Sequence, residues 1–166
     1  GSLPRENGGL VVLEEIKAIF LCAEQKTDEP YYYEGISMGE NALIQKGLEE
    51  LEKGKAVGIS DERKTGMIAE AKFSRAMANF NLLRYFGEFY DQNSIYGIVL
   101  SSTFSKDVVF AKRNTVAEVY TSIIADLEDA STNGPSYMEH YYAGKVAATA
   151  LMARVKLYMN DFEGAA

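Results

Sequence analysis

The sequence predicts an all-α fold of packed helical hairpins, and three stretches carry that prediction. Apolar residues recur at helical spacing within residues 69–87, 113–130 and 144–159, as in helices that bury one face. Gly134 and Pro135 separate the last two stretches and stop a helix. The chain has 166 residues, 47% hydrophobic and 25% charged, which fits a single globular domain with its own core.

The central stretch predicts a helix over about 60–86. Its buried face is expected to comprise Ala69, Phe73, Ala76, Phe80 and Leu83. The polar residues between them are expected on solvent or at the helix rim: Glu70, Lys72, Arg75, Asn79 and Asn81. Ser60 precedes two acids and predicts the helix start. Gly87 is expected to end the helix in a left-handed conformation.

Two further helices follow. Thr115 and Glu118 have the spacing of a capping box, and the face of the helix they open is expected to be Val116, Tyr120 (or Val119), Ile123, Leu127 and Ala130. Residues 144–159 form an alanine-rich helix, with Ala147, Ala150, Leu151, Arg154, Val155 and Tyr158 on its pattern. Another helix begins near Asp161, so we expect the chain to be part of a longer protein.

The remaining segments are less regular. Residues 10–26 predict a helix, although Leu10–Leu13 could equally begin extended, and Pro30 precedes a second predicted helix over about 32–54. Residues 88–113 have no helical period, and within them 96–100 and 108–110 could form a small hairpin. A connection this long is usually functional or structured in its own right.

Composition excludes several classes of function. A net charge of −7 argues against a nucleic-acid partner, which needs a basic face, and against anionic lipid. The single cysteine, Cys22, excludes an internal disulfide and is expected to be a buried small hydrophobe, and no Cys/His cluster could hold a metal. Phe20 and Leu21 before Cys22 do not fit a lipid-attachment site. The opening Gly1-Ser2 has the form of a tag-removal scar. No cofactor is predicted.

No catalytic constellation is visible, so we predict a protein that is not an enzyme. The one histidine, His140, lies in a loop and is expected to be exposed. Eleven tyrosines and eight phenylalanines are the compositional oddity. Because sugars stack on aromatic faces while amides and carboxylates bind their hydroxyls, the ligand-binding candidates are Asp28, Tyr31, Tyr32, Tyr33, Phe89, Tyr90 and Tyr96. The alternative is that these rings pack helix ends, and the helical aromatics Tyr85, Phe86, Tyr120 and Tyr158 are expected in the core or in helix contacts.

Three blocks of sequence carry a resemblance to a known family. AEAKFSRAMANFNLLRYFG (69–87), RNTVAEVYTSIIADLEDA (113–130) and GKVAATALMARVKLYMNDFEGAA (144–166) resemble, in order, three motifs of the SusD/RagB family. The last block also looks like a tetratricopeptide hairpin. Asn160 stands where the SusD/RagB family usually has a turn glycine, and asparagine tolerates left-handed geometry. Arg75, Arg84 and Arg154 match family arginines and are expected to act as structural clamps.

The resemblance implies a tetratricopeptide-like fold, stacked as a short right-handed superhelix, with one irregular insertion at about 88–113. It also implies a single helical-repeat domain over 1–166 of a surface-exposed outer-membrane lipoprotein of Bacteroidetes. Such a protein would bind oligosaccharides without catalysis and cap a SusC-like TonB-dependent transporter, this part supplying mainly scaffold and transporter contact. The alternative reading is a tetratricopeptide adaptor that grips a partner peptide in a concave groove.

Overall fold

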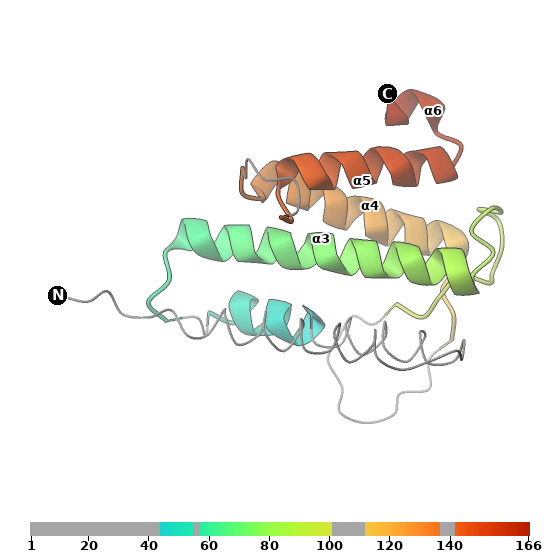
Figure 1. Cartoon of the computed structure of the whole chain (residues 1–166). Coiled ribbons are helices and arrows are strands. Elements are labelled where there is room, and N and C mark those ends of the chain that lie inside the picture. The colour runs from blue at the N-terminus through green and yellow to red at the C-terminus, as the bar shows by residue number, and fades with distance from the viewer. Residues whose placement is uncertain (1–43, 55–56, 101–111, 137–141) are drawn as a thin grey trace, which may run out of the picture.

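The computed structural model describes residues 44–54, 57–100, 112–136 and 142–166. A helical segment covers residues 44–52, followed by α3 (Asp61–Phe86), α4 (Val116–Asn133), α5 (Lys145–Tyr158) and the short α6 (Phe162–Ala165). Successive long helices run in opposite directions, with α4 between α3 and α5 (Figure 1). Within the described ranges no residue lies in a β-strand. The all-α prediction is confirmed, whereas the superhelical stacking stays a prediction.

The predicted helix starts are confirmed, each with a physical cause. The Ser60 hydroxyl accepts a hydrogen bond from the backbone N–H of Arg63, 3.2 Å away, and caps α3. At α4 the capping box is complete, since the Thr115 hydroxyl accepts from the Glu118 backbone N–H and the Glu118 carboxylate accepts from the Thr115 backbone N–H. That second bond lowers the pKa of Glu118. Both helices therefore begin where local side-chain chemistry places them.

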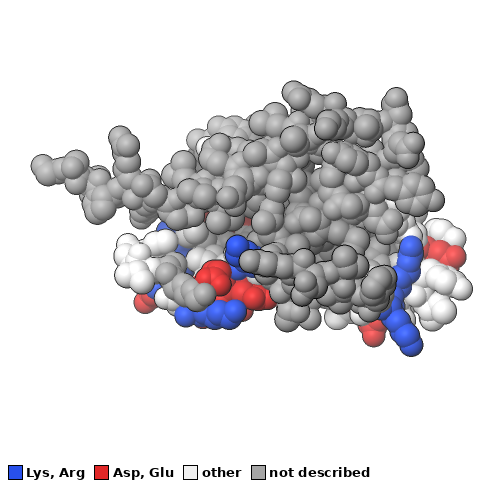
Figure 2. Space-filling model, turned by 90° about the horizontal axis from the view of Figure 1, so that it is seen from below, with Lys and Arg blue, Asp and Glu red and all other residues white. Residues whose placement is uncertain are grey.

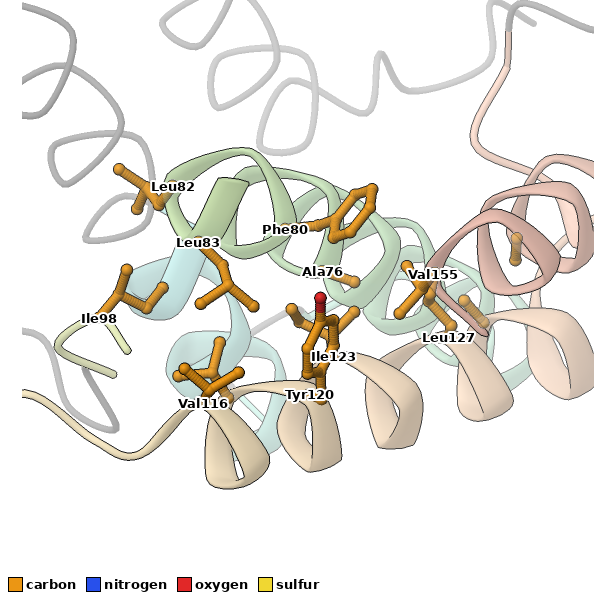
Figure 3. Packing of buried hydrophobic residues seen from close by; sticks show 13 residues of the cluster. Ala76, Phe80, Leu82, Leu83, Ile98, Val116, Tyr120, Ile123, Leu127 and Val155 are labelled. Atoms are coloured by element: carbon orange, nitrogen blue, oxygen red, sulfur yellow. The ribbon is translucent and has the colours of Figure 1, made fainter. Parts of the chain in front are cut away.

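The core lies between α3, α4 and α5 (Figure 3). The predicted faces meet there: Ala76, Phe80 and Leu83 from α3 pack with Val116, Val119, Tyr120, Ile123, Leu127 and Ala130 from α4. Val155 of α5 joins them, and Ile98 adds an apolar side chain from the connection after α3. Small Ala76 and Ala148 have no exposed surface, which lets neighbouring helices approach closely at those points.

A partly buried ion pair joins α3 to α4. The Arg75 guanidinium donates two hydrogen bonds to the Asp126 carboxylate, from Nε at 2.8 Å and Nη2 at 2.7 Å. A third goes from Nη1 to the Gln45 amide oxygen at 2.7 Å. Hydrogen bonding to Asp126 raises the pKa of Arg75 above its ordinary value. The prediction that Arg75 is a structural clamp is confirmed, and its partner Asp126 is buried.

Four other expectations need correction. Gly87 is extended rather than left-handed; a side chain there would meet the Leu83 Cδ1 atom at 2.7 Å. Asn79 is buried instead of lying on the rim. Tyr85 is 71% exposed and not in the core. Arg154 is exposed, with no ion pair among the described residues, so it is not a clamp.

The other arginine, Arg84, acts as a clamp of a different kind. Its guanidinium carbon lies 5.3 Å from the ring centroid of Tyr158 and 5.5 Å from that of Phe80. A cation over an aromatic face is attracted by the negative face of the ring. Arg84 therefore ties the end of α3 to the end of α5 through aromatic rings.

The distribution of surface charge and the lengths of the helices were also compared with the sequence-based arguments against nucleic-acid and lipid partners. In the coloured part of Figure 2, Lys and Arg side chains lie beside Asp and Glu side chains without forming a patch of one sign, and no helix of the described part is long and apolar enough to cross a membrane. The predicted helix over 10–26, the start of the one over 32–54, Cys22 and His140 lie outside the described residues.

Candidate functional site

The connection that follows α3, residues 87–100, holds three of the predicted site residues. It leaves the end of α3 and returns beside the start of α4 without regular secondary structure. Short turns fold it, since the Asp91 backbone N–H donates to the Glu88 carbonyl and the Ser94 backbone N–H donates to the Asp91 carbonyl. The predicted irregular insertion is thus confirmed for its described part.

A serine at the centre of this loop fixes its shape. The Ser94 hydroxyl, nearly buried, donates to the Glu88 carboxylate at 2.6 Å and accepts from the Tyr96 backbone N–H at 3.0 Å. The Glu88 backbone N–H in turn donates to the Tyr96 carbonyl at 2.9 Å. These bonds close a ring of contacts across the loop, so Tyr96 projects from an ordered backbone.

Residues 97–100 pair with the chain that enters α4. The Gly97 backbone N–H donates to the Asn114 carbonyl at 3.0 Å, and the Asn114 backbone N–H donates to the Ile98 carbonyl at 2.8 Å. Arg113 reaches from the same segment to the carbonyls of Phe86 and Gly97. Residues 108–110, the second arm of the possible hairpin with 96–100, lie outside the described ranges, so that pairing stays a prediction.

This pairing requires glycine at position 97. A Cβ atom added there would lie 2.4 Å from the Asn114 carbonyl oxygen, closer than van der Waals contact allows. We expect Gly97→Ala to open the pairing and to lower the free energy of unfolding by about 1–3 kcal/mol, as overpacking does. Urea denaturation of the purified variant measures this.

Gly47→Ala is the matched control for that substitution. Gly47 lies in the helical segment 44–52, and nothing comes within 4 Å of an added Cβ. Alanine there should stabilise the protein by up to about 1 kcal/mol through helix propensity. A Gly97→Ala variant that unfolds at the wild-type urea concentration would contradict the close approach.

Phe89 faces inward and anchors the loop. Its ring packs against the core and lies 5.6 Å, centroid to centroid, from that of Tyr158. Its carbonyl accepts a hydrogen bond from the Tyr120 hydroxyl at 2.9 Å. Burial, with a smaller electrostatic contribution from the neighbouring Tyr158, raises the pKa of Tyr120 to about 12, so this donor keeps its proton throughout the physiological range. The Phe89 ring is thus partly buried against the core, and its role as a ligand-binding residue stays a prediction.

Tyr90 and Tyr96 present their rings to solvent. They are 68% and 56% exposed, and Tyr90 packs edge-on against Phe89 at 5.5 Å between centroids. Acidic Asp91 and the amide side chains of Gln92 and Asn93 belong to the same loop. Aromatic faces beside carboxylates and amides suit a ligand that has both C–H patches and hydroxyl groups, the combination found in a sugar.

Two exposed residues at this end of α3 were not among the predicted candidates. Tyr85, in the last turn of α3, is 71% exposed, and Ile95 in the loop is 64% exposed. Helical geometry places position 85 about 160° around α3 from Ala69, off the predicted buried face. That offset is the signal that could have assigned Tyr85 to the surface.

The four remaining ligand-binding candidates, Asp28, Tyr31, Tyr32 and Tyr33, lie outside the described residues. In the described ranges no group of His, Cys, Asp and Glu could hold a metal ion. An open hollow of about 560 Å³ lies near the start of α3, between Arg63, Asn133 and Lys145, and contains none of the predicted site residues.

A family model and several solved structures of known proteins match this chain, and they point to the same family. Residues 21–157 match the model of a SusD-like family described as starch-binding and associating with the outer membrane. No curated protein sequence matches the chain significantly. Among solved structures, a candidate sugar-binding protein from Bacteroides vulgatus is 28% identical, with a TM-score of 0.74 over 84% of this chain and 32% of its own.

Two further solved structures show the same fold. A SusD superfamily protein, also from Bacteroides vulgatus, is 27% identical with a TM-score of 0.72, over 79% of this chain and 30% of its own. Surface glycan-binding protein A from Bacteroides fluxus is 24% identical with a TM-score of 0.65, over 81% of this chain and 27% of its own. The chain thus spans about a third of the length of these solved relatives.

Proposed function

Because the chain belongs to the SusD-like family, we propose that it is part of a carbohydrate-binding protein that serves nutrient uptake at the outer membrane. The match over residues 21–157 is the observation that carries the proposal. The family description names starch binding and no catalysed reaction, which agrees with the prediction of a protein that is not an enzyme. An adaptor that grips a peptide has no comparable observation in its favour.

The helices of this part are the scaffold of the binding protein. Arg75 and Asp126 lock α3 to α4, and hydrogen bonds fix the loop at residues 87–100 to the start of α4. A rigid loop loses little conformational entropy when a ligand binds, so the ring faces of Tyr90 and Tyr96 can contribute most of their contact energy to affinity. We propose that the sugar contacts of this part lie on these two rings.

The proposal extends to a partner and a location. We propose that the full protein lies on the cell surface at the outer membrane and docks on a SusC-like TonB-dependent transporter, because the family description names association with that membrane. Co-purification of the full-length gene product with a transporter from the same cells tests this part. Recovery of the protein alone from solubilised outer membranes would contradict it.

A double substitution tests the sugar contacts. We expect Tyr90→Ala with Tyr96→Ala to weaken binding of a maltooligosaccharide or another retained glycan by at least about thirtyfold, since each of the two stacked rings contributes roughly 1–3 kcal/mol by analogy with base stacking. Affinity gel electrophoresis on a polysaccharide panel finds the ligand. Calorimetry on the full-length product then measures the dissociation constant.

Tyr142→Ala is the matched control for these tyrosines. Tyr142 is 49% exposed but lies just before α5, at the opposite end of that helix from Tyr158. Its loss should leave the dissociation constant unchanged. Equal binding by the double variant would move the site elsewhere on the protein. Failure of the full-length product to bind any glycan would overturn the function itself.

A further inference from the structure

The guanidinium of Arg84 has aromatic rings around it and no acidic partner among the described residues. Its central carbon lies 5.3 Å from the ring centroid of Tyr158 and 5.7 Å from that of Tyr85. The other two arginines of α3, Arg63 and Arg75, each pair with a carboxylate. In the part of the chain that the structure describes, Arg84 thus keeps a positive charge that no ion pair neutralises.

The rings leave the hydrogen-bonding edge of this guanidinium available. A ring stacks on the flat face of a guanidinium, whereas its five N–H donors point outward in its plane. The Arg84 side chain is partly exposed, so a ligand can reach those donors. Their fork matches the two oxygens of a carboxylate and can donate two parallel hydrogen bonds to it.

The rings around Arg84 continue into the loop that carries the candidate sugar contacts. The ring of Tyr158 also lies 5.6 Å from that of Phe89, which in turn lies 5.5 Å from that of Tyr90. The carboxyl ends of α3 and α5 and the loop at residues 87–100 lie at the same end of the fold (Figure 1). The guanidinium and the exposed Tyr90 ring therefore belong to one continuous run of aromatic contacts.

The two acidic side chains of this loop are held by the loop itself. The Glu88 carboxylate accepts a hydrogen bond from the Ser94 hydroxyl. The Asp91 carboxylate accepts one from the Asn93 backbone N–H at 2.9 Å. The carboxyl end of α3 carries only about half a negative charge, so it offsets part of the Arg84 charge and not all of it. Although the chain has a net charge of −7, salt screens exposed charges that lie more than about 10 Å away.

We propose that Arg84 determines the specificity of the candidate sugar site and that the glycan it selects contains a uronic acid. The carboxylate of that sugar pairs with the guanidinium, and a neighbouring sugar ring stacks on Tyr90. A neutral sugar offers only hydroxyl groups, whose hydrogen bonds with a cation are weaker than those of a carboxylate. This inference rests on the proposed carbohydrate binding and adds the charge of the ligand to it.

A panel of uronic-acid oligosaccharides, each paired with its carboxyl-reduced neutral form, tests the inference on the full-length gene product. For the glycan that binds, we expect the dissociation constant of the reduced form to exceed that of the acidic form by about tenfold to a hundredfold, as for hydrogen bonds to charged groups. Arg84→Met keeps a flexible apolar side chain against the rings and should abolish this preference. Calorimetry measures both dissociation constants.

Two further variants separate binding from packing. Arg84→Lys keeps the charge without the planar fork, so it should retain only part of the preference, and it keeps the test decisive should Arg84→Met not fold. Arg63→Met, near the start of α3, removes an arginine that pairs with Glu70 and should leave the ratio of dissociation constants unchanged.

Three results would contradict the inference. Equal binding of the acidic and reduced forms, or a preference that survives in Arg84→Met, would overturn the role of Arg84 and leave the proposed function standing. Absence of binding to every glycan, acidic or neutral, would overturn both.

Discussion

Replacing Asp126 with alanine should lower the free energy of unfolding by about 3–5 kcal/mol, because it leaves the Arg75 charge without its partner inside the protein. The Asp126 side chain is 7% exposed and that of Arg75 is 21% exposed, so water can replace the lost carboxylate only in part. The Gln45 amide that remains is neutral and cannot balance the guanidinium. Urea denaturation followed by circular dichroism measures the loss.

A neighbouring acid provides the control for this substitution. Asp129, one turn further along α4, pairs with Lys72, and both side chains are about a quarter exposed. Burial alone would raise the pKa of Asp129, but its hydrogen bonds from Lys72 and Asn133 together lower it. Asp129→Ala should cost no more than about 1 kcal/mol, as exposed ion pairs do.

A variant that lacks both charged groups separates the loss of the ion pair from the cost of leaving one charge buried without a partner. Arg75→Met combined with Asp126→Leu should be more stable than Asp126→Ala alone, because no charge is then left buried without a partner. If Asp126→Ala and Asp129→Ala lowered stability equally, the pair between α3 and α4 would not be the clamp that the geometry indicates.

The helices could be predicted from the sequence because their signals are local. The faces of α3 and α4 follow from apolar spacing, and the caps at Ser60 and Thr115 follow from side chains three residues from their partners. Each of these interactions lies within one or two turns of one helix, so periodicity and capping rules capture it. The family motifs overlap the same stretches.

Tyr85 could have been placed from its position on the helix, but the environments of Asp126 and Gly87 involve segments that are distant in the sequence. Asp126 sits at the edge of the apolar face of α4, where an acid is normally solvated; an arginine 51 residues earlier in the chain makes its burial possible. Gly87 ends α3 as predicted, but in an extended conformation, and a side chain there would meet the Tyr96 carbonyl oxygen at 3.2 Å. No local pattern encodes such contacts between segments.

The candidate site was predicted only in outline. Composition singled out the aromatic residues of the loop, but not which rings point outward. Phe89 turns inward because it meets Tyr158 of α5 and Tyr120 of α4, whereas Tyr90 stays in solvent. Choosing between them requires the packing of α5 against α3, which the sequence pattern of the loop does not contain.

Phe80→Ala should lower the free energy of unfolding by about 3–5 kcal/mol, the range for loss of a buried phenylalanine. Phe80 is 1% exposed, and its ring meets that of Tyr158 edge-on, with centroids 5.2 Å apart at 84°. The substitution leaves a cavity between α3 and α5 and removes one of the rings that hold Arg84. Thermal or urea unfolding measures the loss.

Two variants define what Phe80 contributes. Met77→Ala, at a 38% exposed position of the same helix, should cost less than about 1 kcal/mol, because little apolar surface is lost there. Phe80→Leu keeps much of the volume and should recover most of the stability, short of the roughly 0.5–1.5 kcal/mol of the ring pair. A loss from Phe80→Ala no larger than that from Met77→Ala would contradict a core centred on this ring.

Phe80→Ala should also loosen the loop of the candidate site. The ring of Tyr158 contacts those of both Phe80 and Phe89, at 5.2 and 5.6 Å between centroids. When Phe80 is removed, Tyr158 gains room to move, and the anchor of the loop that carries Tyr90 loosens with it. We therefore expect faster amide hydrogen exchange across residues 87–96 in Phe80→Ala, under conditions where the variant remains folded. Unchanged exchange in that loop would show that the hydrogen bonds of Ser94 and Tyr120 suffice to hold it.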